Sequence, residues 1–432
     1  MSNIGNLCIV CPDPTRSARI AAFFEQARYR VEIRKDADAA LAAMRANAPD
    51  VALLLDAPEP AARLLHALRA APETVDVSLA FADGGRLDEA AACAADDVLP
   101  ADIDADAMVF RLQPLFRLAT MRSEMRLRAE GVEMQHPDPA PAPGPARALY
   151  LGLDPAMTLP ADFLGRDAVW ESAASTAEAE AIITGPGTYD LVVIDAPRSR
   201  LDDVQAFCRD MRDNPRLFSL PFLVRMPHVG GAAARDLYRV GVSRVIGAAD
   251  GAREAQAEAR SLIALQHNRT AVREALRRTL TEATGHPRQA VYTEDFLKAY
   301  LDRRIAAAEA HHRALSVVHL HLPEAVSLHD EAGETACRTL SEQIARWIAR
   351  LIRVEDLAAR LSDSDFIVVL PDTLPSEAQV VMNRIAGVLT FTDFAVPEVY
   401  RPVKVWPLVG VAGLEPGDRP ETILGRAAAN LG

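Results

Sequence analysis

Short runs of consecutive hydrophobic residues alternate with longer stretches rich in alanine and arginine over much of the chain. Two early runs, at residues 7–14 and 51–56, each reach an aspartate that is followed closely by proline. Two later runs, at residues 149–153 and 191–195, repeat this arrangement. Apolar runs of this length without polar alternation are typical of strands that are buried on both faces of a parallel sheet. The pattern therefore predicts two copies of a βα module.

The proline-rich stretch at residues 137–145 separates the two copies, and proline favours an extended, semi-rigid linker. A long region without helix breakers, at 254–283, predicts a helix that leads into a third domain. We expect the first module at residues 4–130, the second at 147–270 and the third domain at 284–432.

The third domain shows mixed periodicities. They predict a strand at 315–322, an amphipathic helix at 335–352 and a hairpin around 362–365. A helix at 377–388 and a late strand at 403–412 are expected to follow. The whole chain is therefore expected to belong to the α/β class.

Composition limits the choice of partners. The chain has 432 residues, and 60 Asp and Glu outnumber 47 Lys and Arg, which gives a net charge of −13. This balance argues against nucleic acid as the main partner. No apolar run is long enough to cross a bilayer, and no signal peptide is recognised. The five cysteines are scattered and indicate reduced thiols. We expect a cytoplasmic protein without membrane insertion.

Both modules resemble the CheY-like receivers of response regulators, which have a doubly wound parallel sheet and an acceptor aspartate after the third strand. Asp56 and Asp195 are the candidate vestigial phospho-acceptors, although Asp56 lies one residue out of register. Phosphorylation also requires a Ser or Thr after the fourth strand and a nearby Lys. Phe81 and Met226 stand at the Ser/Thr positions, and neither module has the Lys. We therefore expect the modules to dimerise or dock partners without a phosphorylation switch.

A polar turn interrupts the third domain within residues 357–373. The turn and the residues after it are Ser362, Asp363, Ser364, Asp365 and Phe366. This segment resembles the GGDEF hairpin of diguanylate cyclases, which have a palm-like α/β fold. With two receiver-like modules in front, the chain resembles the receiver–receiver–GGDEF family of the PleD and PopA type. The resemblance is greatest to the non-catalytic, PopA-type members.

The resemblance implies that cyclase chemistry has been lost. The paired glycines that let the family's backbone approach GTP are Ser362 and Asp363 here. The two metal-binding acids of the family fall at Ser364 and His321, so no two-metal site is expected. His319 and His321 alternate on one strand without an evident third ligand, which favours packing histidines over a zinc site. We expect no diguanylate cyclase activity and no bound metal.

The resemblance also implies a retained ligand site. Arg353 and Asp356 stand at the family's Arg-x-x-Asp inhibitory site for cyclic di-GMP, and Arg384 stands at its secondary arginine. A carboxylate can accept from guanine N1–H and N2–H, while a guanidinium suits guanine O6 and N7 or a phosphate. The alternative is an exposed ion pair of little consequence. We expect Arg353 and Asp356 to be solvent-accessible, with an arginine of the second module or of another subunit completing the site.

We therefore expect a cyclic di-GMP-binding effector that forms a homodimer through its receiver-like modules. By resemblance, it would be an adaptor that recruits cell-cycle regulators to a ClpXP protease complex at a cell pole. Two alternatives stay open, namely a dimeric scaffold that needs no ligand and a response regulator switched by phosphorylation.

Overall fold

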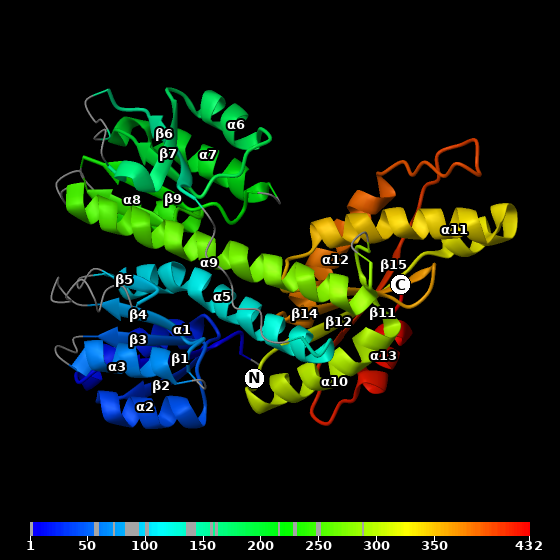
Figure 1. Ribbon diagram of the computed structural model, residues 1–432, viewed down its shortest axis with the longest axis horizontal. Helices are drawn as coiled ribbons and strands as arrows, with labels where there is room; N and C mark the ends of the chain where they lie inside the picture. The colour runs from blue at the N-terminus through cyan, green and yellow to red at the C-terminus, as the bar shows by residue number, and fades with distance from the viewer. Residues whose placement is uncertain are drawn as a thin grey trace.

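The computed structural model describes residues 3–55, 60–71, 74–82, 95–99, 103–134, 144–155, 159, 163–214, 217–227, 231–247, 252–286 and 289–432. Three five-stranded sheets follow one another along the chain, each with its own helices (Figure 1). Asp56 and most of the proline-rich linker lie outside the described residues.

The first module has a fully parallel sheet of order β2-β1-β3-β4-β5. Its core strands β3 and β4 are buried at every position because helices cover both faces. This strand order is that of the doubly wound receiver fold, so the predicted class is confirmed. The elements are β1 (Asn6–Val10), α1 (Pro14–Gln26), β2 (Arg30–Arg34), α2 (Ala37–Ala46), β3 (Val51–Leu55), α3 (Pro60–Ala70), β4 (Ser78–Ala82), β5 (Asp97–Leu99) and α5 (Ala105–Gly131).

The second module repeats this topology, with the sheet order β10-β9-β8-β6-β7 and parallel pairing throughout. Its last helix, α9, continues to Thr284, so the expected module end near residue 270 falls inside this helix. The elements are β6 (Ala146–Gly152), η1 (Gly165–Asp167), β7 (Ala168–Ala173), α6 (Thr176–Thr184), β8 (Leu191–Asp195), η2 (Arg198–Arg200), α7 (Leu201–Asp213), β9 (Phe222–Met226), α8 (Gly231–Arg239), β10 (Arg244–Gly247) and α9 (Ala252–Thr284).

The C-terminal domain has a mixed sheet of order β11-β13-β14-β12-β15, in which β13, β14, β12 and β15 pair antiparallel. The predicted hairpin is formed by β13 and β14. Gly333, at φ 84°, interrupts α11 with non-helical backbone. The elements are β11 (Tyr292–Thr293), α10 (Glu294–Ala310), β12 (Leu315–His321), α11 (Pro323–Leu351), β13 (Leu357–Arg360), β14 (Asp365–Pro371), α12 (Pro375–Thr390), β15 (Leu408–Gly413) and α13 (Pro420–Ala429).

The two long helices α5 and α9 run side by side from the receiver-like modules to the C-terminal domain (Figure 1). A buried ionic cluster joins the modules at one end of this pair. Asp97 of β5 accepts from Arg111 of α5 at 3.1 Å and from Arg244 of β10 at 2.7 Å. Glu258 of α9 contacts the same two arginines at 2.9 and 2.8 Å. Since every charge in the cluster has an opposite partner, its burial is compensated.

A second cluster joins the first module to the C-terminal domain. Glu124 of α5 is fully buried and accepts from the hydroxyl of Tyr300 at 2.6 Å, and it contacts Arg304 at 3.1 Å. Arg313 bridges Asp50 of the first module and Asp372 of the C-terminal domain. The first module, the second module and the C-terminal domain are thus tied together by buried charges.

Candidate functional site

A cavity of about 960 Å³ opens where α5 and α9 meet the C-terminal domain. Its walls come from α5, from the second half of α9, from the end of α11 and the turn before β13, and from loop residues of the second module that include Phe218 and Ser219. Arg353 and Asp356 lie in that turn and line the cavity. The volume lies in the range, about 300–1,000 Å³, that encloses small-molecule ligands.

Arginine dominates the described residues that line this cavity, and Asp356 is the one carboxylate among them. On α9 the arginines recur every four residues, and on α11 two more are spaced in the same way, so each helix presents a basic stripe. Like charges at this spacing repel one another, which favours an anionic partner between the stripes. The arginines are Arg117 and Arg128 of α5, Arg269, Arg273 and Arg277 of α9, Arg346 and Arg350 of α11, and Arg353.

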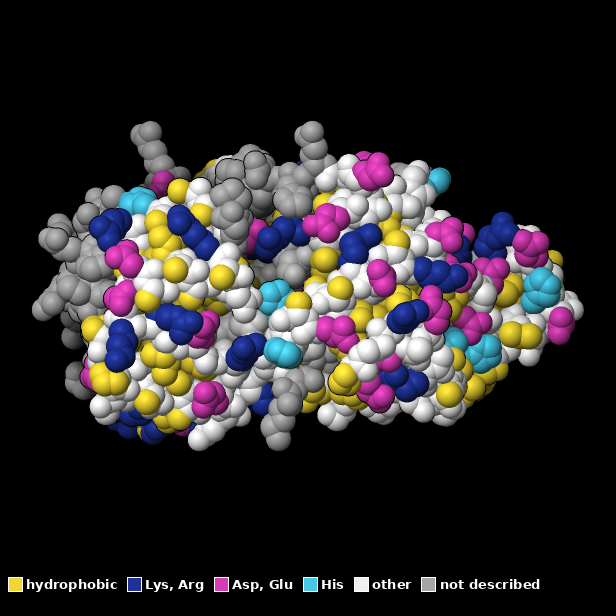
Figure 2. Space-filling view, turned by 90° about the horizontal axis from the view of Figure 1, so that it is seen from below, with side chains coloured by type: hydrophobic (Ala, Val, Ile, Leu, Met, Phe, Trp, Pro, Cys, Tyr) yellow, Lys and Arg dark blue, Asp and Glu magenta, His cyan; other side chains and the backbone are white. Residues whose placement is uncertain are grey.

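Two of these arginines already have acidic partners, since Arg117 contacts Glu355 at 2.8 Å and Arg128 contacts Glu124 at 3.4 Å. None of the other six forms an ion pair within the described part of the chain. The outer surface differs from the cavity, because basic and acidic side chains are interspersed over the face shown in Figure 2. The cavity therefore concentrates uncompensated positive charge in a chain that is acidic as a whole.

Arg269 shows this lack of compensation most clearly. Its one hydrogen bond goes to the backbone carbonyl of Ser219, at 3.2 Å, and its buried Nε has no partner. Burial, followed by the nearby charge of Arg117, lowers the pKa of Arg269 to about 9. A guanidinium that is held without a counter-ion in a cleft is a candidate binding group for an anion.

Asp356 is buried, with 5% of its surface exposed, whereas Arg353 is exposed. The expectation that both are solvent-accessible is therefore wrong for Asp356. Its Oδ2 accepts from the backbone N–H of Arg353 at 2.8 Å, which fastens the turn between α11 and β13. Its Oδ1 is buried without a partner. Burial, with the neighbouring charge of Glu355, raises the pKa of Asp356 to about 7, so the carboxyl group is partly protonated at neutral pH.

Arg384 is exposed on α12 and is not among the residues that line the cavity. The structure thus brings Arg353 and Asp356 together but leaves Arg384 outside their cavity. Sequence reasoning missed the arginines of α9 and α11. Their four-residue spacing was a visible signal, but nothing in the sequence showed that the two stripes face one cavity.

The segment expected to correspond to the family's signature, around residues 362–365, forms the tight turn between β13 and β14. The carboxylate of Asp365 accepts from the hydroxyls of Ser362 at 2.7 Å and Ser364 at 2.6 Å, and it contacts ring nitrogens of His319 and His321 at 2.8 Å each. Burial alone would raise the pKa of Asp365, but these hydrogen bonds together hold it below its usual range. Asp363 forms a 3.6 Å ion pair with Arg360, and Phe366 is buried.

His319 and His321 therefore have a shared partner that the sequence did not reveal. Within the described ranges, no group of three or more His, Cys, Asp or Glu side chains is arranged to hold a metal ion. The side chains around Asp365 therefore satisfy one another's hydrogen-bonding groups.

In the second receiver-like module, Asp195 Oδ2 is hydrogen-bonded, whereas its buried Oδ1 has no hydrogen-bond partner. This residue ends β8 fully buried, accepts from the hydroxyl of Tyr150 at 2.9 Å and lies 3.3 Å from Arg225. Burial raises its pKa. Phe81 and Met226 are buried at the strand ends where a receiver has Ser or Thr. In the first module Asp13 is engaged as the N-cap of α1, through a 2.8 Å hydrogen bond from the N–H of Thr15.

Residues 289–432 match the family described as "Diguanylate cyclase, GGDEF domain". The C-terminal domain is a GGDEF domain. Response regulator PleD of Caulobacter vibrioides is 26% identical over 250 residues, which cover 57% of this chain and 55% of PleD. The match thus spans about half the length of this curated relative.

Solved GGDEF structures also resemble the chain. The FimX GGDEF domain of Pseudomonas aeruginosa is 21% identical, with a TM-score of 0.31, and covers 33% of this chain and 88% of that one. The GGDEF domain of DgcB from Caulobacter crescentus, solved in complex with c-di-GMP, is 18% identical, with a TM-score of 0.31 and coverages of 32% and 80%. No helix in the described part of the chain is long and apolar enough to cross a membrane.

Proposed function

We propose that this protein is a cyclic di-GMP-binding effector without diguanylate cyclase activity, and that the ligand binds in the arginine-lined cavity. The observation that carries the proposal is the combination of six arginines without ion-pair partners and one buried carboxylate with an unused oxygen. The presence of a GGDEF domain and the similarity to a response regulator support a role in cyclic di-GMP signalling.

The chemistry of the cavity matches both parts of such a ligand. Asp356 Oδ1 can accept from guanine N1–H and N2–H, and Arg353 can meet a phosphate or the O6/N7 edge. Cyclic di-GMP is a dianion, so a single Arg-x-x-Asp turn satisfies only part of it. The stripe of Arg269, Arg273 and Arg277, on the last helix of the second module, supplies the remaining positive charge. Arg384 would contribute from outside the cavity and should matter least.

Lack of cyclase activity is proposed from the residues at the signature turn. Ser364 and His321 replace the two metal-binding acids of the family, which removes the carboxylates needed for a two-metal site. Asp365 is engaged by four donors of its own domain. Pure protein with GTP and Mg²⁺ or Mn²⁺ should form no cyclic di-GMP. Steady formation that is abolished by Ser364→Ala or Asp365→Ala would contradict this.

In the cell we propose an adaptor role in which the receiver-like modules dimerise or dock proteins. By resemblance to PopA-type proteins, the partners would be cell-cycle regulators and a protease complex at a cell pole, with the protein in the cytoplasm. The competing functions are a scaffold that needs no ligand and a response regulator that is switched by phosphorylation.

Calorimetric titration of the full chain with cyclic di-GMP tests the proposal. Arg353→Ala should weaken binding by a charge-assisted contact of roughly 1.5–3 kcal/mol, or about 10- to 150-fold. Arg338→Ala is the matched control, since Arg338 lies on α11, the helix that precedes Arg353, but pairs with Glu334 outside the cavity. An equal loss of affinity in both variants would indicate a general effect of charge. If Arg353→Ala binds as tightly as the wild type, Arg353 is not part of the binding site.

A further inference from the structure

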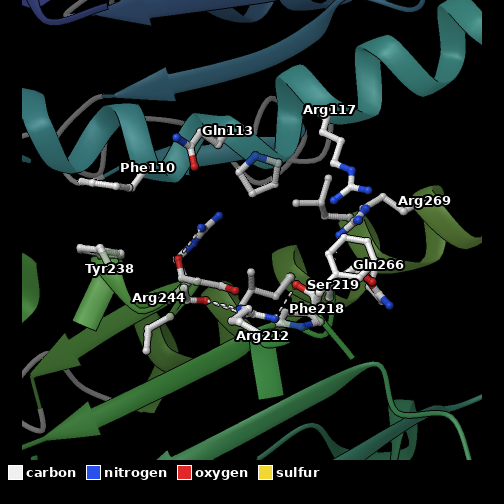
Figure 3. A pocket seen from close by; sticks show the side chains of 17 residues that line it. Phe110, Gln113, Arg117, Arg212, Phe218, Ser219, Tyr238, Arg244, Gln266 and Arg269 are labelled. Carbon is white, nitrogen blue, oxygen red and sulfur yellow. Dashed lines mark hydrogen bonds between the residues drawn. The ribbon is translucent and has the colours of Figure 1, made fainter. Parts of the chain in front are cut away.

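A second, smaller cavity of about 240 Å³ lies between the two receiver-like modules (Figure 3). Phe110, Gln113 and Pro114 of α5 form one wall, and Tyr238 of α8 lies opposite. The volume is below the roughly 300–1,000 Å³ of pockets that enclose a whole drug-sized ligand. The small cavity therefore suits one part of a larger molecule.

The small cavity adjoins the arginine-lined cavity. Residues that line both are Arg117, Phe218, Ser219, Gln266 and Arg269. In Figure 3 the side chains of Arg117 and Arg269 lie close together at one end of the small cavity. The guanidinium of Arg117 stacks over the ring of Phe218, at 4.4 Å from its centroid. A ligand in the large cavity can thus extend past these arginines into the small one.

The other arginines of the small cavity have no capacity left for an anion. Arg244 is held by Asp97 and Glu258, and Arg212 donates to backbone carbonyls that include those of Phe218 and Gly241. The uncompensated charge therefore lies at the shared end, at Arg269. This places the anionic part of a ligand at the shared end and a neutral part in the interior.

The interior is suited to a planar, hydrogen-bonding ring. Phe110 and Tyr238 offer aromatic faces, and aromatic side chains can stack on any nucleic-acid base. The side-chain amides of Gln113 and Gln266 are used by no hydrogen bond within the described part of the chain. Pro114 lies inside α5 and has no N–H, so the carbonyl of Phe110 lacks its usual helical donor. The amide donors and acceptors of the two glutamines together complement the edge of a purine.

We infer that the small cavity takes one guanine base of a bound cyclic di-GMP, while a phosphate of the same molecule stays at Arg117 and Arg269. This inference rests on the proposed function, because the arginine-lined cavity must hold the rest of the ligand. The base would contact α5 of the first module and α8 of the second. Ligand binding would then strengthen the contact between the two receiver-like modules.

Calorimetry on the full chain with cyclic di-GMP separates the two cavities. Phe110→Ala should weaken binding about 5- to 150-fold through lost stacking. Gln113→Leu, at an exposed position of the same helix, should weaken it about 2- to 12-fold through a lost hydrogen bond. Gln379→Leu is the matched control, because Gln379 is a partly buried glutamine on α12 that lines neither cavity.

The outcomes distinguish this inference from the proposed function. Suppose that Arg353→Ala weakens binding while the affinities of Phe110→Ala and Gln113→Leu stay within twofold of that of the wild type. The base then lies elsewhere, and the inference about the small cavity is wrong while the proposed function stands. If the wild type does not bind micromolar cyclic di-GMP, both fail. Should circular dichroism show that Phe110→Ala is misfolded, Gln113→Leu decides the matter.

Discussion

Asp356 and Asp365 flank the strand β13 in the same domain, yet their surroundings are opposite. Asp365 accepts from two serine hydroxyls and contacts two histidine rings, and its pKa is held low. Asp356 has one backbone donor and one buried oxygen without a partner, and its pKa is raised to about 7. A carboxylate whose acceptors are filled by its own domain has little left for a ligand. The comparison therefore favours Asp356 over the signature turn as a ligand-binding group.

Replacing Asp356 gives the largest expected effect. Asp356→Ala should weaken cyclic di-GMP binding about 10- to 150-fold, because the guanine edge loses a charged acceptor worth roughly 1.5–3 kcal/mol. Calorimetry of the purified variant measures this, and circular dichroism checks the fold. A variant that binds as tightly as the wild type would show that Asp356 does not contact the ligand.

Binding should also depend on pH through Asp356. Guanine N–H groups require the ionised carboxylate, and a pKa of about 7 leaves only a minority ionised at pH 6. Affinity should therefore rise about 10-fold from pH 6 to pH 8. Asp356→Asn should bind weakly and with a flatter profile. The same steep profile in Asp356→Asn would assign the titration to another group.

The raised pKa also predicts an effect on stability. The folded pKa of Asp356, about 7, lies above its ordinary value of 3.8, so the folded state holds the proton more tightly than the unfolded state does. This carboxyl group therefore lowers stability progressively as pH rises from about 4 to about 7. The melting temperature of the wild type should fall relative to Asp356→Asn across that window. A constant difference would contradict the burial of an ionisable group here.

Replacing Asp365 should affect folding stability more than ligand affinity. Asp365→Asn should cost about 1–3 kcal/mol of folding stability, because the hydroxyls and histidines lose a charged partner. Its effect on cyclic di-GMP affinity should be within twofold. Denaturant unfolding and calorimetry on the same sample measure both quantities. Loss of binding without loss of stability would show that the signature turn contacts the ligand.

The sequence predicted the elements with the strongest local signals. The apolar runs of β3 and β8 are buried on both sides, so their pattern alone identified two parallel sheets. The long helix α9 followed from the absence of breakers. Helix α5 begins at Ala105 and continues through Pro114, although a proline inside a helix is unfavourable unless tertiary packing compensates for it.

The site was less accessible to sequence reasoning. The position of Arg353 and Asp356 relative to the signature is a local feature and could be read directly. The burial of Asp356 depends on how α5 and α9 pack against the turn, which involves residues far apart in the chain. The placement of Arg384 away from the cavity and of Asp365 beside His319 and His321 likewise depends on tertiary contacts.

The smallest effect is expected at the receiver-like modules. Asp195 is fully buried, its Oδ2 accepts from the hydroxyl of Tyr150, and its Oδ1 lies 3.3 Å from Arg225 without a hydrogen bond, so the carboxylate is shielded from a phosphoryl donor. Acetyl phosphate should leave the oligomeric state unchanged in analytical ultracentrifugation. A change that is blocked by Asp56→Asn or Asp195→Asn would instead support a phosphorylation switch.

We propose that Asp356 and the surrounding arginines bind cyclic di-GMP and that the signature turn does not. Calorimetric titration of the wild-type full chain at pH 8, beside Arg353→Ala and Asp365→Asn, tests it most directly. We expect saturable binding at micromolar or lower ligand concentration, which is weakened in Arg353→Ala and retained in Asp365→Asn. Absence of binding in the wild type, or binding lost only in Asp365→Asn, would contradict it.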